Sequence, residues 1–181
     1  MNQIIALIVG ESGSGKTTVC ERLGQKYGLK QISSYTTRPP RSDDEVGHRF
    51  ISPHQMPPKS EMCAYTMYHG HHYFATHQQV DEADLYVIDP VGIQFFKEHY
   101  RGDKIPKVIK IEVPVVERLK RMAARGDKAF EVMKRNELDK RVFADVTADA
   151  VFENLDLETC VDEIYNYLCE QEGKLMSDES D

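Results

Sequence analysis

The chain has 181 residues, of which 40% are hydrophobic and 29% are charged, and its formal net charge is -7. This length suits one compact domain with modest insertions, whose core needs neither disulfides nor a structural metal. The negative charge argues against a surface that binds a nucleic-acid polymer, because such a surface needs an excess of Lys and Arg. Any anionic ligand must therefore be held by a local cluster of cations.

The cysteines and the apolar segments indicate the cellular compartment in which the protein is expected. The four cysteines are widely scattered and form no Cys-x-x-Cys pair, which favours reduced thiols over a zinc or redox motif. The apolar run Ile4–Val9 is too short for a signal peptide or a membrane span. We therefore expect a cytoplasmic protein that does not bind membranes.

The first 28 residues read as strand, glycine-rich turn and helix. Ile4–Val9 is a continuous β-branched apolar run, typical of a strand buried on both faces. From Lys16 to Tyr27 the apolar residues follow a helical stripe, and Gly28 is the residue expected to end that helix. This order begins an α/β fold.

The remaining apolar patterns alternate in the same way. They predict strands over 85–88, 108–113 and 150–152, and helices over 93–100, 115–124, 129–142 and 156–169. Such alternation predicts a mainly parallel sheet flanked by helices. Residues 33–77, rich in Pro, His and Tyr, are expected to form a small, partly β insertion, and the charged stretch 121–141 a helical lid. The acidic tail 170–181 is expected to be disordered.

Residues 10–17 fit the phosphate-binding pattern G-x-x-x-x-G-K-[ST] without a mismatch. Their glycines allow the backbone to wrap around an anion, and the following helix directs its N-terminal dipole at it. Lys16 can reach the β- and γ-phosphates of ATP, and the Thr17 hydroxyl can bind the cofactor Mg²⁺. The predicted ATP ligands in this segment are Gly10, Ser12, Gly13, Ser14, Gly15, Lys16, Thr17 and Thr18.

Asp89 ends an apolar strand and leaves two interpretations open. It can position Mg²⁺ through water, as a Walker B carboxylate does, or it can begin the D-x-x-G motif of a GTPase. A GTPase also needs an N-K-x-D element, and the nearest match, at 136–139, lacks the lysine. The GTPase interpretation is therefore disfavoured.

A second anion site is predicted at residues 33–41, where Arg38 and Arg41 lie three residues apart beside two prolines. Arginine binds phosphate oxygens in a bidentate manner, and proline reduces the entropy lost in holding the segment. From these residues alone, a solvated basic loop explains the pattern equally well.

From residue 4 to about 168 the sequence resembles the guanylate kinase family. Residues 34–41 match its S-x-T-T-R-x-P-R motif, residues 69–73 its H-G-x-x-Y motif, and residues 88–92 its I-D-x-x-G motif. The resemblance implies that the acceptor nucleotide is bound by Ser34, Arg38, Arg41, His48, Tyr73, Thr76 and Asp89.

The resemblance continues into the predicted lid. Residues 121–126 are similar to the family's R-L-x-x-R-G motif, which with Lys16 and Arg38 gives Arg121, Arg125 and Arg135 catalytic roles in neutralising charge. Asn154 stands where a V-x-N motif approaches the donor adenine. The resemblance thus implies a single P-loop kinase domain over 1–169 that uses ATP, Mg²⁺ and a small phosphorylated acceptor.

Several residues depart from the family pattern at the acceptor base. Ala64 stands at the guanine-reading glutamate, and alanine cannot accept hydrogen bonds from guanine. His48 replaces a tyrosine, residues 73–76 replace Y-G-T-S, and Val87 replaces an aspartate. The leading hypothesis is therefore a nucleoside monophosphate kinase whose base is left open. The alternatives are a ribose 1,5-bisphosphate phosphokinase, a non-catalytic nucleotide-binding scaffold module, and a free-standing ATPase.

Overall fold

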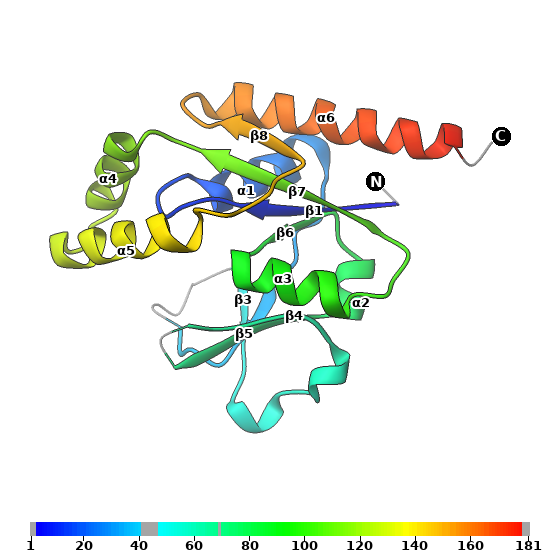
Figure 1. The fold of residues 1–181 in the computed structure, drawn as a ribbon, viewed down its shortest axis with the longest axis horizontal. Helices are drawn as coiled ribbons and strands as arrows, with labels where there is room; N and C mark the ends of the chain where they lie inside the picture. The colour runs from blue at the N-terminus through cyan, green and yellow to red at the C-terminus, as the bar shows by residue number, and fades with distance from the viewer. Residues whose placement is uncertain (1–2, 41–46, 69, 179–181) are drawn as a thin grey trace.

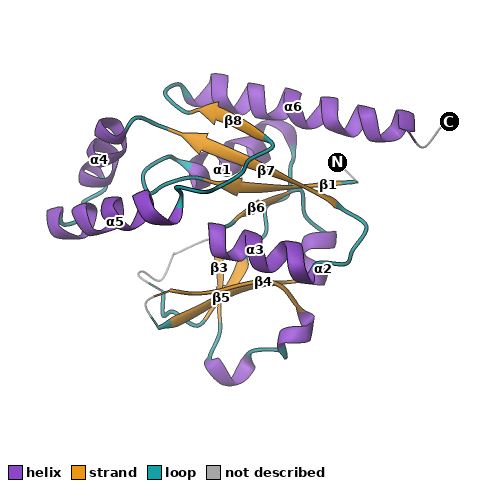
Figure 2. Ribbon diagram, in the orientation of Figure 1, coloured by secondary structure: helices purple, strands orange, loops and turns teal. Residues whose placement is uncertain are grey.

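The computed structural model describes residues 3–40, 47–68 and 70–178. Within these ranges the chain forms two four-stranded sheets with helices packed around them (Figures 1 and 2). The predicted α/β fold with a mainly parallel sheet flanked by helices is confirmed.

The first sheet is entirely parallel and has the strand order β6-β1-β7-β8. All six residues of β1 are buried, because alternate side chains enter two different cores. One core lies under helices α1 and α6, and the other lies under α2 and α3. The elements are β1 (Ile4–Val9), α1 (Lys16–Tyr27), α2 (His77–Asp81), β6 (Leu85–Val87), α3 (Pro90–His99), β7 (Ile105–Glu112), β8 (Ala150–Glu153) and α6 (Leu157–Asp178).

The second sheet lies within the predicted insertion and has the order β3-β2-β5-β4. Its strands are β2 (Ser34–Thr36), β3 (His48–Phe50), β4 (Met62–Tyr68) and β5 (His71–Thr76). The short 3₁₀ helices η1 (Pro53–Gln55) and η2 (Lys59–Glu61) precede β4. Helix α3 packs against β4, so it lies between the two sheets and joins them into one structure (Figure 1).

Helices α4 (Val115–Ala124) and α5 (Ala129–Val142) follow β7 and stand apart from the two sheets (Figure 1). Their bounds match the sequence prediction, since each stretch has strong helix formers and ends at a turn. The buried residues of α5 are Val132, Asn136 and Asp139. Two polar groups therefore occupy most of the inward face of this helix.

The prediction of disorder from residue 170 is wrong for 170–178, because α6 continues to Asp178. Leu175 packs on the core beneath α1 and α6, and the backbone N–H of Gln3 donates to Glu172 Oε1 at 3.0 Å. These contacts stabilise a helical extension that a reading of local polarity alone misses.

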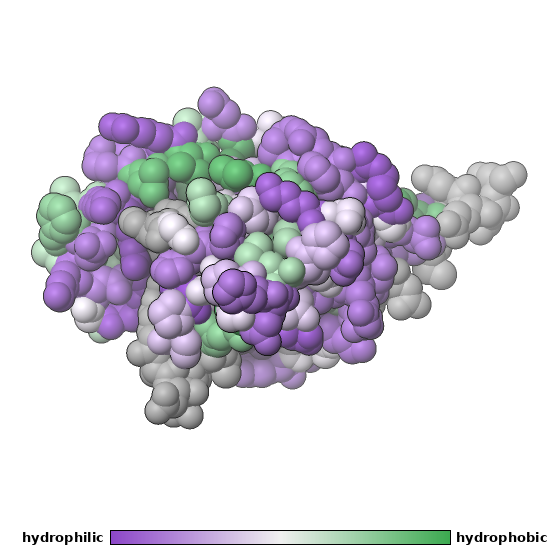
Figure 3. Space-filling view, turned by 90° about the horizontal axis from the view of Figure 1, so that it is seen from below, coloured by the Kyte–Doolittle hydropathy of each residue, from purple (hydrophilic) through white to green (hydrophobic). Residues whose placement is uncertain are grey.

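The face of the molecule seen in Figure 3 is mostly hydrophilic, with apolar areas between the polar side chains. Across residues 3–40, 47–68 and 70–178, none of the helices combines the length and the apolar character that crossing a bilayer requires.

Candidate active site

The loop between β1 and α1 is shaped by two glycines with left-handed backbone conformations. Gly13 has φ 82° and Gly15 has φ 87°. A Cβ atom on Gly13 would lie 2.7 Å from the carbonyl oxygen of Arg118, and one on Gly15 would lie 2.4 Å from Asn154 Nδ2. No side chain caps α1, so its first amides are available to a ligand. The loop therefore has the close packing and the exposed donors of a phosphate cradle.

Lys16 stands over this cradle. Its Nζ donates to the carbonyl oxygens of Gly10 at 2.6 Å and Glu11 at 3.3 Å. Desolvation lowers the pKa of Lys16 to about 8, while the negative charge of Asp139 acts in the opposite direction. A bound phosphate would favour the charged ammonium, because an opposite charge nearby raises the pKa of a lysine.

A cavity of about 560 Å³ opens beside the loop. Most of the predicted ATP ligands and the three arginines of the predicted lid line this cavity, whereas Gly10 lines a neighbouring cavity and Ser14 is fully buried. An anionic ligand there would meet a local cluster of cations, as the negative net charge of the chain requires. Its lining includes Ser12, Gly13, Gly15, Lys16, Thr17, Thr18, Arg121, Arg125, Arg135 and Asn154.

Asn154 braces the phosphate-binding loop. Its side-chain Nδ2 donates to the carbonyl oxygen of Ser14 at 2.8 Å, and its own carbonyl accepts from Arg121 Nη2 at 2.8 Å. The residue is buried. In this structure its side-chain amide is therefore committed to the loop, although the residue lines the cavity in which the donor adenine contact was expected.

The other two lid arginines share one partner. Arg125 Nη2 and Arg135 Nη1 pair with Asp127 Oδ2 at 2.5 and 3.3 Å. Both must exchange this carboxylate for ligand oxygens if they are to neutralise a transferring phosphoryl group.

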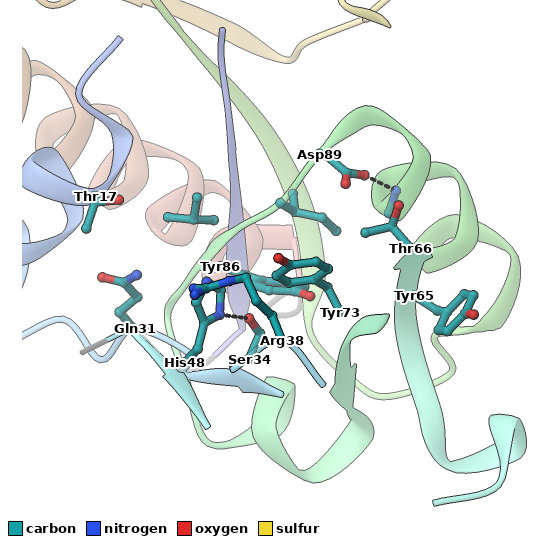
Figure 4. A pocket seen from close by; sticks show the side chains of 14 residues that line it. Thr17, Gln31, Ser34, Arg38, His48, Tyr65, Thr66, Tyr73, Tyr86 and Asp89 are labelled. Carbon is teal, nitrogen blue, oxygen red and sulfur yellow. Dashed lines mark hydrogen bonds between the residues drawn. The ribbon is translucent and has the colours of Figure 1, made fainter. Parts of the chain in front are cut away.

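A second cavity, of about 440 Å³, lies between the second sheet on one side and Thr17, β6 and the start of α3 on the other (Figure 4). Ser34 Oγ and His48 Nδ1 share a hydrogen bond of 3.0 Å on one side of it, next to Arg38, while Asp89 and Thr66 stand on the opposite side. Thr17 lines both this cavity and the first one, so the two cavities adjoin there. The predicted acceptor ligands in this lining are Ser34, Arg38, His48, Tyr73 and Asp89.

Asp89 is held firmly at the start of α3. Its Oδ1 accepts from the backbone N–H of Gly92 at 2.6 Å, as an N-cap does. Burial raises the pKa of Asp89, and hydrogen bonds from Gly92 and the Thr66 hydroxyl act in the opposite direction. The carboxylate therefore faces the second cavity in a fixed orientation.

The donor set at Thr17 fits Mg²⁺ delivered with a nucleotide. Among the residues that the structure describes, no group of three or more His, Cys, Asp or Glu side chains could hold a metal ion. Mg²⁺ keeps several waters and is commonly held by one or two protein oxygens together with substrate phosphates. The Thr17 hydroxyl beside the phosphate cradle provides such an oxygen.

A sequence model of guanylate kinases matches residues 2–171. The chain belongs to the guanylate kinase family. The predicted resemblance is thereby confirmed, and membership of this family supports a nucleotide kinase.

Individual relatives agree with this assignment. The guanylate kinase of Fusobacterium nucleatum is 30% identical over 81 residues, which are 42% of this chain and 44% of that protein. The chain thus matches less than half the length of this curated relative. A crystal structure of guanylate kinase from Anaplasma phagocytophilum is similar in fold, with a TM-score of 0.61 and 19% identity over 93% of this chain and 86% of that one. An uncharacterized protein from Eubacterium ventriosum has a TM-score of 0.52 at 15% identity, over 93% and 99% of the two chains.

Two predicted acceptor ligands are not among the described residues that line the second cavity. Thr76 lines a separate hollow with Tyr35 and His77, and its hydroxyl accepts from the backbone N–H of Gln79 to cap α2. Arg41 lies outside the described residues. The role of each as an acceptor ligand stays a prediction.

Sequence reasoning missed Thr66 and Arg118. Thr66 stands beside Asp89 on the same side of the second cavity, two residues beyond Ala64, which is buried in the core. Arg118 is 3% exposed and touches the phosphate-binding loop. Its spacing from Met122 on α4 places both on one helical stripe, and a charged residue on that buried stripe is the signal that would have revealed it.

Proposed function

We propose that this protein transfers the γ-phosphate of ATP to a nucleoside monophosphate. The observation that carries the proposal is the meeting of two cavities at Thr17. One cavity is built from the phosphate-binding loop and the lid arginines, and the other contains Arg38, His48 and Tyr73. Two adjoining anion sites suit a reaction between two phosphorylated substrates, whereas a simple ATPase needs only one.

The proposed chemistry requires positioning and charge neutralisation more than a covalent catalyst. Lys16 and the amides at the start of α1 hold the donor triphosphate. Mg²⁺, held by the Thr17 hydroxyl and phosphate oxygens, would supply further positive charge there. Arg38 and Tyr73, with Arg41, bind the acceptor phosphate. The attacking atom is already a phosphate oxygen, so no strong general base is needed.

The lid arginines are proposed to neutralise the charge that develops on the transferring group. Arg121, Arg125 and Arg135 line the same cavity as Lys16. Preorganised cations in a site that excludes water stabilise such charge far more than they do in bulk solvent. Closure of α4 and α5 over the nucleotides also limits wasteful hydrolysis of ATP.

We propose that the specificity for the acceptor base is lower than in a site where two carboxylates bind guanine. Asp89 is the acidic residue among the described lining residues of the acceptor cavity, and it already accepts from Gly92. Ala64 adds no acceptor, because it is a buried methyl group. The same loss of base-reading groups supports the second candidate, a kinase that acts on ribose 1,5-bisphosphate.

The decisive experiment measures ADP release from ATP and Mg²⁺ in the presence of single acceptors. The set is GMP, dGMP, AMP, CMP, UMP, dTMP and ribose 1,5-bisphosphate, with Lys16→Ala as the blank. Stimulation by at least one nucleotide, lost by on the order of a hundredfold or more in the blank, is expected. Stimulation by the sugar bisphosphate alone would move the protein to the second candidate. Nucleotide binding without stimulation by any acceptor would favour a non-catalytic module.

A further inference from the structure

A carboxylate from the lid occupies part of the phosphate-binding loop. Asp139 Oδ2, on α5, accepts from the backbone N–H of Ser12 at 2.7 Å. Asp139, Ser12 and Lys16 line a common cavity, which also includes Gly10 and Arg135. Backbone N–H groups of such a loop are the donors that bind phosphate oxygens. An anionic side chain therefore stands where an anionic ligand is expected.

Arg118 holds this carboxylate against the loop. The guanidinium Nη1 donates to the carbonyl oxygen of Ser12 at 3.1 Å and lies 3.8 Å from Asp139 Oδ2. Its Nη2 lies 3.3 Å from both Glu11 Oε1 and Asn136 Oδ1. Through one buried side chain, both lid helices are therefore tied to the loop.

The character of these contacts points to exchange with a polar ligand. Asp139 is 7% exposed and Arg118 is 3% exposed, so both charges are largely removed from water. Apolar residues of similar volume would hold two helices together at least as well, because buried ion pairs carry a large desolvation cost. If Asp139 moves away, Arg118 keeps Glu11 as a partner, and Ser12 N–H becomes free for a phosphate oxygen.

We propose that Asp139 is an internal substitute for the terminal phosphate of the donor nucleotide. It occupies the Ser12 amide in the empty site, is displaced by a triphosphate, and returns once the donor has become a diphosphate. The proposal rests on the proposed function in taking ATP as the donor. Lys16 shares the cavity with Asp139, and the P-loop lysine is the residue that reaches the β- and γ-phosphates. Asp139 therefore discriminates between ATP and ADP and couples the lid to the presence of the third phosphate.

The test compares nucleotide affinities without any acceptor. Isothermal titration calorimetry is performed with a non-hydrolysable ATP analogue that has an imido bridge, and separately with ADP, both with Mg²⁺. Asp139→Ala is expected to bind the analogue about tenfold more tightly than the wild type does, with a change of less than about twofold for ADP. Asp139→Asn keeps the size of the side chain and one acceptor oxygen, and should give a smaller gain in the same direction.

Glu137→Gln is the matched control. Glu137 is on the same helix, is exposed, and pairs with Lys140, so its substitution changes the net charge by the same amount without touching the loop. It is expected to leave both affinities within about twofold of wild type, since exposed charges are strongly screened. Circular dichroism and thermal unfolding show whether each variant is folded.

The outcomes separate the inference from the proposed reaction. An equal gain for both nucleotides, the same gain in Glu137→Gln, or no gain in either Asp139 variant would overturn the role of Asp139. These results do not depend on phosphoryl transfer, because no acceptor is present. The expected affinity pattern in a protein that no acceptor stimulates would refute only the reaction. Absence of nucleotide binding in the wild type would refute both.

Discussion

At the scale of single residues, the phosphate-binding loop is fixed by atoms that come from distant parts of the chain. Gly13 lies against the backbone of Arg118, and Gly15 lies against the side chain of Asn154. The local sequence predicts that glycines are needed here, because the contiguous pattern G-x-x-x-x-G-K-[ST] forms the same loop conformation in different proteins. It does not predict which residues surround them, since Arg118 and Asn154 are brought there by the fold.

Gly13→Ala is expected to abolish detectable nucleotide binding and to lower the unfolding temperature. The added methyl group would need a left-handed conformation and would clash with the backbone of Arg118, which cannot rotate away. Calorimetry and thermal unfolding measure the two effects. The control is Gly173→Ala in α6, where the added Cβ would meet no other side chain within 4 Å. This variant is expected to gain about 0.5–1 kcal/mol in the free energy of unfolding. Normal nucleotide affinity in Gly13→Ala would contradict this account of the loop.

The lowered pKa of Lys16 predicts how affinity depends on pH. Its value of about 8 in the empty site means that Lys16 loses its charge as the pH rises through 8, and an anionic ligand then loses an attractive partner. The affinity for the ATP analogue should therefore fall between pH 7 and pH 9. Calorimetry at several pH values measures this fall, and Lys16→Ala should bind weakly with a much flatter profile. An unchanged slope in Lys16→Ala would assign the effect to another group.

The lowered pKa of Lys16 also makes the stability of the fold depend on pH. Between about pH 8 and the ordinary pKa of 10.5, the unfolded chain binds a proton at Lys16 that the folded chain does not. The free energy of unfolding contributed by this group therefore rises with pH across that window, opposite to the trend in affinity.

At the scale of elements, the sequence predicted the helices and strands that have a long hydrophobic pattern. It failed for elements that depend on contacts with residues far away in the sequence. Helices α4 and α5 have their predicted bounds, and β1 was evident from its apolar run. The second sheet was expected only as a partly β insertion, because its strands are short and its pairing is non-local. The end of α6 was missed since one half-buried leucine on a polar segment carries little periodic signal.

Leu175→Ala tests whether residues 170–178 contribute to the fold. Leu175 packs on the core beneath α1 and α6, so its truncation should lower the free energy of unfolding by about 1 kcal/mol. Denaturant unfolding gives the value, and Lys174→Ala serves as an exposed neighbour with no expected loss. Identical stability of Leu175→Ala and wild type would instead support the sequence-based prediction that this tail is disordered.

At the scale of the whole molecule, the two cavities take most of their lining from different parts of the chain and share Thr17. The proposed donor cavity is lined by the phosphate-binding loop, α1, α4 and α5, while the proposed acceptor cavity is lined by the second sheet, β6 and the start of α3. Such a division lets one site be altered while the other is preserved. The sequence predicted both sites from contiguous motifs, but it gave no indication that Thr17 adjoins both.

Arg38→Ala is expected to raise the KM for the stimulating acceptor on the order of tenfold to a hundredfold, because a charge-assisted bidentate contact to its phosphate is lost. Affinity for the ATP analogue should stay unchanged, since Arg38 lines only the acceptor cavity. Steady-state kinetics and calorimetry give the two quantities. Arg49→Ala is the control, as Arg49 is on the neighbouring strand and contacts Tyr35 instead. A similar rise in KM for both variants would show that the effect comes from the loss of positive charge in general and not from a contact made by Arg38.

The burial of Ala64 also limits how this protein can change during evolution. A glutamate at that position would place a carboxylate in the apolar core that lies under α2 and α3, and an unpaired buried charge is strongly destabilising. The substitution Ala64→Glu would therefore lower the stability of the fold before any gain in guanine recognition could matter. Thr66, already at the cavity wall, is the more accessible starting point for a new acidic contact. An acidic contact to the base is thus added at a lower cost in stability at position 66 than at position 64.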